Sequence, residues 1–151
     1  MERMDPAWTL ALLAVSYLVG SIPFAYLIAR ARGVDIRAVG SGNVGATNVG
    51  RVLGAKWGVL TFLLDAAKGC LPVIVAPWGY ARAADGAAAP WLGLACGAAA
   101  VAGHVWPVWL RFRGGKGVAT CAGVLLGVAP WAAAAGAAAW AAVFAVRRIV
   151  S

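Results

Sequence analysis

The feature that most constrains this chain is a succession of long apolar segments with very little charge inside them. Hydrophobic residues make up 63% of the 151 residues and charged residues only 12%, and the mean hydropathy is +0.83. A soluble domain of this length needs more charge on its surface, whereas helices that face lipid do not. The sequence therefore predicts an all-α, polytopic bundle of transmembrane helices, formed as a single integral membrane domain over residues 1–151.

Five apolar segments predict five spanning helices. The first is long enough to cross about 30 Å of hydrocarbon, and Pro23 is expected to kink its second half. A polar, glycine-rich stretch to Arg51 separates it from the second segment. The five predicted spans are residues 8–29, 57–78, 91–110, 118–128 and 131–146.

The basic residues predict how these helices are oriented. Cytoplasmic loops carry an excess of lysine and arginine. Only Arg82 lies between the second and third segments, and no basic residue lies between the fourth and fifth. The other loops and the C-terminal end are basic, with Arg30, Arg32, Arg37, Arg51, Lys56, Arg111, Arg113, Lys116, Arg147 and Arg148. Five spans with the N-terminus outside place every strongly basic, glycine-rich loop in the cytoplasm, where the loops would share a site.

The net charge of +8 does not indicate nucleic-acid binding. The cations flank apolar segments, and the chain lacks the pattern of a basic groove with interleaved aromatic residues that binds single strands. Nucleic acid is therefore excluded as a predicted partner.

The run GSGNVGATNVGR, residues 40–51, predicts an anion-binding loop. Glycines allow successive backbone N–H groups to point into one concavity, and an arginine adds a planar charged fork for phosphate. The run also satisfies G-x-G-x-x-G, but the acid twenty residues later, Asp65, lies inside an apolar segment, so we reject a dinucleotide-binding fold. A flexible connection is the alternative interpretation.

Three further features carry polar chemistry. Gly114, Gly115, Lys116 and Gly117 resemble a phosphate-holding arrangement, whereas Arg111 and Arg113 are interpreted as membrane anchors. Asp65 and Lys68 share one helical face inside an apolar segment, which favours Lys68 as a ligand-binding residue oriented by Asp65; a pair that only neutralises itself is the alternative. His104, the only histidine, is interpreted either as structural, or as a donor of a hydrogen bond to phosphate or a base. The five carboxylates never cluster, so no metal or other cofactor is predicted.

Several of these motifs in order resemble the bacterial membrane glycerol-3-phosphate acyltransferases that use acyl phosphate. They are GSIPFAYL, GSGNVGATNVGR, DAAKG, GHVWPVWLRFRGGKGVAT and RIVS. The resemblance implies transfer of a fatty acyl group from acyl phosphate to the 1-hydroxyl of glycerol 3-phosphate in phospholipid biosynthesis, at the cytoplasmic face of the inner membrane. It also implies membrane lipid as a partner. Family members with seven helices continue beyond the R-x-x-S pattern, so the resemblance implies a chain that is truncated after Ser151.

The predicted site follows from these motifs together. Predicted catalytic residues are Ser41, Arg51, Lys116 and His104, and Asp65 is a predicted supporting residue. Predicted phosphate-binding residues are Gly40, Ser41, Gly42, Asn43, Gly45, Thr47, Asn48, Arg51, Lys68, Gly114, Gly115, Lys116, Gly117, Arg148 and Ser151. Two other functions remain open from sequence, a transporter for a phosphorylated small molecule and a structural membrane subunit without a ligand.

Overall fold

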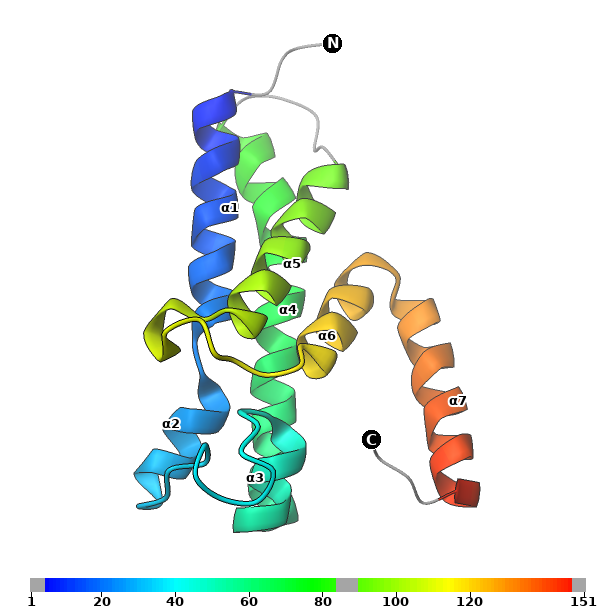
Figure 1. Ribbon diagram of the computed structural model, residues 1–151. Coiled ribbons are helices and arrows are strands. Elements are labelled where there is room, and N and C mark those ends of the chain that lie inside the picture. The colour runs from blue at the N-terminus through cyan, green and yellow to red at the C-terminus, as the bar shows by residue number, and fades with distance from the viewer. Residues whose placement is uncertain (1–4, 84–89, 148–151) are drawn as a thin grey trace.

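The computed structural model describes residues 5–83 and 90–147, and the regular elements in these ranges are all helices (Figure 1). They are α1 (Pro6–Ser21), α2 (Phe24–Ala31), α3 (Ala46–Leu53), α4 (Ala55–Ala83), α5 (Pro90–Val105), the 3-10 turn η1 (Val108–Leu110), α6 (Val118–Val128) and α7 (Pro130–Arg147). The all-helical prediction is thus confirmed for the described residues.

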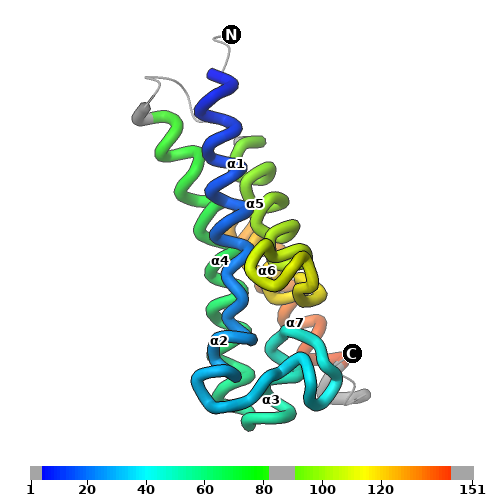
Figure 2. The backbone as a smooth tube through the Cα atoms, turned by 60° about the vertical axis from the view of Figure 1, so that its left-hand side comes forward, coloured from blue at the N-terminus to red at the C-terminus, as the bar shows by residue number. Residues whose placement is uncertain are grey.

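Helix α4 is the central element of the bundle. It packs against α1, α3, α5 and α6, and α1 also runs along α5 (Figures 1 and 2). Helix α7 packs against α6 and stands beside the main bundle (Figure 1).

Within residues 5–83 and 90–147, three stretches are long and apolar enough to cross a membrane. They are Pro6–Ala31, Ala55–Ala81 and Trp91–Leu110, and Val118–Val128 is a shorter apolar helix. These helices support the membrane class that the sequence predicts. The count of five spans and the orientation of the loops stay predictions.

Prolines divide two of the predicted spans. We expected one kinked helix over residues 8–29, but α1 ends at Ser21 and α2 begins only at Phe24. Pro23 has no N–H and forces Ile22 out of the helical region, to φ −59° and ψ 116°. Likewise the expected helix over residues 91–110 ends at Val105, and η1 follows Pro107.

The sequence suggested a loop for the whole polar stretch between the first two spans, but part of this stretch is helical. Residues Ala46–Leu53 form α3, which lies close against the start of α4. A Cβ atom on Gly58 would come within 2.7 Å of Gly50 Cα, so this crossing needs glycine at position 58 of α4. Thr47, Asn48 and Arg51 therefore lie on a helix rather than on a flexible loop.

Glycines also set the distance between α4 and α6. A Cβ atom on Gly123 would collide with the carbonyl oxygen of Ala66, and one on Gly69 would collide with the carbonyl oxygen of Thr120. Close backbone approach through small residues is a common way for helices to associate in membranes, because lipid is as apolar as the side chains.

We predict that Gly123→Ala destabilises the bundle. The added methyl group meets backbone that cannot move aside, and overpacking of this kind costs about 1–3 kcal/mol. The measurement is the thermal midpoint of the purified protein in detergent. Gly79→Ala in α4 is the control, because a Cβ atom there meets nothing within 4 Å. An unchanged midpoint for Gly123→Ala would contradict this account of the α4–α6 contact.

Candidate functional site

A basic cleft of about 1000 Å³ lies between the loop before α3 and the loop before α6. The first loop contributes Ser41, Gly42 and Asn43, and the second contributes Gly114 and Lys116. The two glycine-rich motifs, about 70 residues apart in the sequence, therefore face one another as the shared-site prediction requires. The cationic residues that line the cleft are Arg37, Arg111, Arg113 and Lys116.

The charge of the cleft indicates an anionic ligand. The lining includes four cations, a serine hydroxyl and an asparagine amide, and none of the lining residues is a carboxylate. Guanidinium and ammonium groups together with neutral donors are the groups that bind phosphate in proteins. Sequence reasoning treated Arg111 and Arg113 as anchors and Arg37 only as a topogenic charge. Their position beside the glycines was the signal that could have indicated a binding role.

Arg37 is fixed at the cleft by Asp35. Its backbone N–H and Nε donate to Asp35 Oδ1 at 3.1 and 3.0 Å, and a terminal guanidinium nitrogen donates to Oδ2 at 2.7 Å. The guanidinium also lies 4.7 Å from the centre of the Tyr26 ring. The hydrogen bonds from Arg37 lower the pKa of the Asp35 carboxyl to about 2, so the pair stays ionised at neutral pH.

Asn48 holds the first loop in shape. Its side chain is about 1% exposed, and Nδ2 donates to the carbonyl oxygens of Ile36, Val39 and Asn43 at 3.1–3.2 Å. Its Oδ1 accepts the backbone N–H of Ser41 at 2.9 Å. These contacts occupy the amide that the sequence assigned to phosphate binding, so Asn48 shapes the wall of the cleft from behind.

The second loop is attached to the end of α5. The backbone N–H groups of Gly114 and Gly115 donate to the carbonyl oxygens of Val105 and His104 at 3.0 and 3.2 Å. We expected these two amides to face a phosphate, but they are used to cap a helix. Just before them, Arg111 and Phe112 have positive φ values of 53° and 61°. Such strained backbone is typical of functional segments.

The remaining predicted residues lie in several places. Gly40 and Gly45 flank the cleft-lining part of the first loop, and Gly117 is the N-cap of α6. Thr47 and Arg51 are exposed on α3 and do not line the cleft. Lys68, Asp65 and His104 are buried inside the bundle. Arg148 and Ser151 lie outside the described residues.

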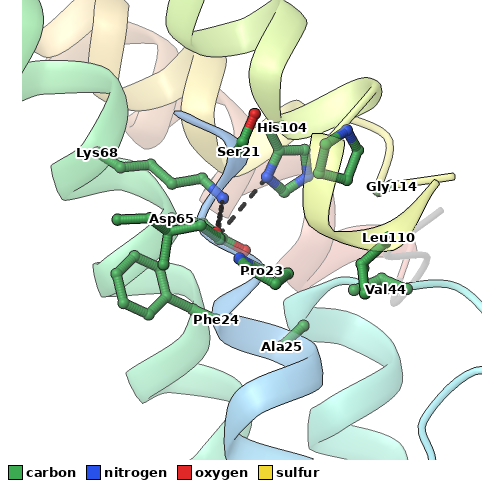
Figure 3. A pocket seen from close by; sticks show the side chains of 13 residues that line it. Ser21, Pro23, Phe24, Ala25, Val44, Asp65, Lys68, His104, Leu110 and Gly114 are labelled. Carbon is green, nitrogen blue, oxygen red and sulfur yellow. Dashed lines mark hydrogen bonds and ion pairs between the residues drawn. The ribbon is translucent and has the colours of Figure 1, made fainter. Parts of the chain in front are cut away.

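A second, small pocket of about 10 Å³ lies next to the cleft, and Figure 3 shows side chains that line it. It is lined by Asp65 and Lys68 from α4, His104 from α5 and Ser21 at the end of α1. Val44, Leu110 and Gly114 line both the pocket and the cleft. The buried charges are therefore adjacent to the loops that form the cleft.

The buried side chains of this pocket contact one another. Lys68 Nζ lies 2.7 Å from Asp65 Oδ1 and donates to the carbonyl oxygen of Ile22 at 2.8 Å. His104 Nδ1 lies 3.6 Å from the same carboxylate oxygen. Among the described residues, no three histidine, cysteine or acidic side chains are placed to hold a metal ion.

These features define a class: an all-helical membrane protein with a cleft built for an anionic, phosphate-like group. Comparison with known proteins gives the family. The sequence model of the glycerol-3-phosphate acyltransferase family matches residues 10–151, and this chain belongs to that family.

Individual relatives agree with this membership. The chain is 54% identical over 144 residues to the glycerol-3-phosphate acyltransferase of Myxococcus xanthus, covering 95% of this chain and 72% of that one. The fold is similar to two crystal structures of PlsY (YgiH), an integral membrane glycerol 3-phosphate acyltransferase. The glycerol 3-phosphate form has a TM-score of 0.83 at 45% identity, covering 94% of this chain and 68% of that chain. The lysophosphatidic acid form has a TM-score of 0.78 at 44% identity, covering 90% and 64%.

We predict that Asn48→Asp opens the first loop. The new oxygen would face three carbonyl oxygens, and each unsatisfied buried group costs about 1–3 kcal/mol. Hydrogen exchange of residues 36–45 should become at least about tenfold faster. Asn43→Asp makes the same chemical change at a partly exposed position of the same loop and should leave this exchange rate close to that of the parent. Equal exchange rates in the two variants would contradict the role given to Asn48.

Proposed function

We propose that this chain transfers a fatty acyl group from acyl phosphate to the 1-hydroxyl of glycerol 3-phosphate and so forms lysophosphatidate. The observation that carries the proposal is the cleft of four cations between two glycine-rich loops, in a member of the glycerol-3-phosphate acyltransferase family. The similar crystal structures are described as glycerol 3-phosphate and lysophosphatidic acid forms, which match the acceptor and the product of this reaction.

The size and charge of the cleft suit two phosphate-bearing substrates. Pockets for small ligands usually measure about 300–1000 Å³, and this cleft is at the upper end of that range. Arg37 is paired with Asp35, so Arg111, Arg113 and Lys116 supply most of the positive charge for the phosphates. Ser41 and Asn43 on one wall and Lys116 on the other wall place donors on both sides of the bound groups.

The chemistry needs positioning and charge stabilisation more than a nucleophilic side chain. Acyl phosphate is a mixed anhydride, so the glycerol hydroxyl oxygen attacks the acyl carbon directly. The new C–O ester bond forms, the C–O bond to phosphate breaks, and the hydroxyl proton passes to the departing phosphate. Cations that hold both phosphates bring the reacting atoms together and stabilise the negative charge that develops.

The acyl chain requires an apolar path from the cleft into lipid. Trp109 lines the cleft and is 63% exposed, and Phe112 and Val118 nearby in the sequence are also largely exposed. These side chains supply an apolar surface beside the cations. We propose that the acyl chain lies along it while its phosphate end is held in the cleft.

We also propose the membrane arrangement that the basic loops indicate. Five spans with the N-terminus outside place Arg37, Arg111, Arg113 and Lys116 on the cytoplasmic side of a bacterial inner membrane. Both substrates would then reach the cleft from the cytoplasm or from the inner leaflet. Within this arrangement residues 1–151 act as one multi-pass domain.

A transporter for a phosphorylated molecule is less well supported. Transporter sites lie near the midplane of the membrane at the junction of structural repeats, whereas this cleft is formed by loops that connect helices. The family and both similar structures are acyltransferases. A purely structural subunit leaves the four converging cations without a purpose.

The test of the proposed function is product formation by membranes that contain this chain, supplied with acyl phosphate and labelled glycerol 3-phosphate. We expect lysophosphatidate from the parent, and a loss of about 10- to 100-fold in Lys116→Ala, because a hydrogen bond to a charged group contributes about 1.5–3 kcal/mol. Lys56→Ala is the matched control, since Lys56 is an exposed cation beside Trp57 and does not line the cleft.

Equal losses in the two lysine variants would show that general positive charge, and not the cleft, supports the reaction. Retention of labelled glycerol 3-phosphate in sealed vesicles without acyl product would favour the transporter.

A further inference from the structure

The buried cluster of Asp65, Lys68 and His104 lies outside the cleft and needs its own explanation. These three residues are only 1%, 3% and 7% exposed, and none of them lines the cleft. Buried ion pairs usually stabilise a protein less than apolar residues of the same size would, because both charges must lose their water. Ionisable groups inside a membrane bundle therefore indicate a role beyond stability.

Lys68 is occupied by neighbouring groups in the bundle. Its ammonium contacts Asp65 and also donates to the carbonyl oxygen of Ile22, at the break between α1 and α2. Pro23 interrupts the hydrogen bonds of the helix at this break. Lys68 thus joins α4 to the broken helix and fixes the position of Asp65, which favours this role over the predicted binding of a ligand.

His104 connects this ion pair to the second loop. On one side, Nδ1 lies 3.6 Å from Asp65 Oδ1. On the other side, a Cβ atom on Gly115 would collide with Nε2, so the imidazole ring packs directly against this glycine. The carbonyl oxygen of His104 also accepts the N–H of Gly115 at 3.2 Å. Lys116, which lines the cleft, is the next residue in the chain.

The small pocket completes the connection (Figure 3). Asp65 Oδ1 forms an ion pair with Lys68, but this contact does not have the geometry of a hydrogen bond. Ser21 Oγ and His104 Nδ1 likewise have no hydrogen-bond partner among the described residues. All three atoms belong to residues that line a pocket of about 10 Å³, which is the size of one water molecule. One water there would bridge the carboxylate and the imidazole across 3.6 Å.

We propose that Asp65, fixed by Lys68, is a positioning residue that holds His104 in one orientation, and that His104 in turn holds the Gly114–Lys116 segment so that Lys116 faces the cleft. Within the acyltransferase reaction proposed above, on which this inference rests, the cluster acts through the loop and not on the substrates. It keeps the phosphate-binding wall of the cleft preorganised.

The test uses a variant that removes both charges together. Asp65→Asn with Lys68→Gln leaves no uncompensated buried charge, so the thermal midpoint should stay close to that of the parent. The carboxylate that orients His104 is lost, however. We expect about tenfold faster hydrogen exchange of residues 112–117 and about a tenfold higher KM for one phosphate-bearing substrate, with kcat changed less than twofold.

Thr61→Val is the matched control for this double variant. Thr61 is buried on α4 one turn before Asp65, and its hydroxyl donates only to the carbonyl oxygen of Trp57 in the same helix at 2.8 Å. It should leave exchange and KM unchanged. If the double variant does not fold, His104→Gln replaces it, because this change removes the imidazole without altering the ion pair and should give the same faster exchange.

The outcomes separate the inference from the proposed function. A well-folded double variant, or His104→Gln, with exchange of residues 112–117 and KM equal to those of Thr61→Val would overturn the inference and show a purely structural pair. Faster loop exchange in a chain whose parent forms no lysophosphatidate would support the positioning role and refute the acyltransferase reaction of this chain.

Discussion

The rest of the structure depends on how backbone polar groups are satisfied where apolar helices break. Away from water, an unpaired carbonyl or N–H group costs several kcal/mol, so a broken helix needs substitute partners. The Ile22 carbonyl oxygen accepts a hydrogen bond from the Lys68 ammonium. The carbonyl oxygens of Val105 and His104 accept hydrogen bonds from the backbone N–H groups of Gly114 and Gly115, respectively. The Trp106 carbonyl oxygen accepts a hydrogen bond from the Tyr17 hydroxyl at 2.7 Å. Lys68 and Tyr17 come from distant parts of the chain, and Gly114 and Gly115 come from the loop after η1, so each break is also joined to another element.

The two breaks bring the functional loops to one place. Pro23 and Pro107 both line the small pocket, and the loops that follow these prolines in the chain form the walls of the cleft. Because α1 packs along α5, the breaks in these two helices lie side by side. The groups that donate hydrogen bonds to the carbonyl oxygens at these breaks therefore also fix the positions of Arg37, Lys116 and the other cations of the cleft.

The sequence predicted the features that are governed by local pattern. The apolar segments, a helix from about Val118 to about Val128, and the Asp65–Lys68 pair three residues apart are all present in the structure. It did not predict α3, because glycine and asparagine have low helix propensity and packing against α4 stabilises this helix instead. Nor could spacing reveal that Asn48 bonds to carbonyl oxygens 5 to 12 residues before it.

The glycines of the second motif show why residue type alone does not identify binding groups. Glycine is favoured both where a backbone amide approaches a phosphate and where two backbones pack together, and the sequence pattern is the same in both cases. Here Gly114 and Gly115 pack against the end of α5, and their amides are already bonded. Side-chain cations must then supply most of the attraction for an anion in the cleft. Such contacts depend on the exact position of the loop that carries them, which makes the buried support beneath Lys116 as important as the lysine itself.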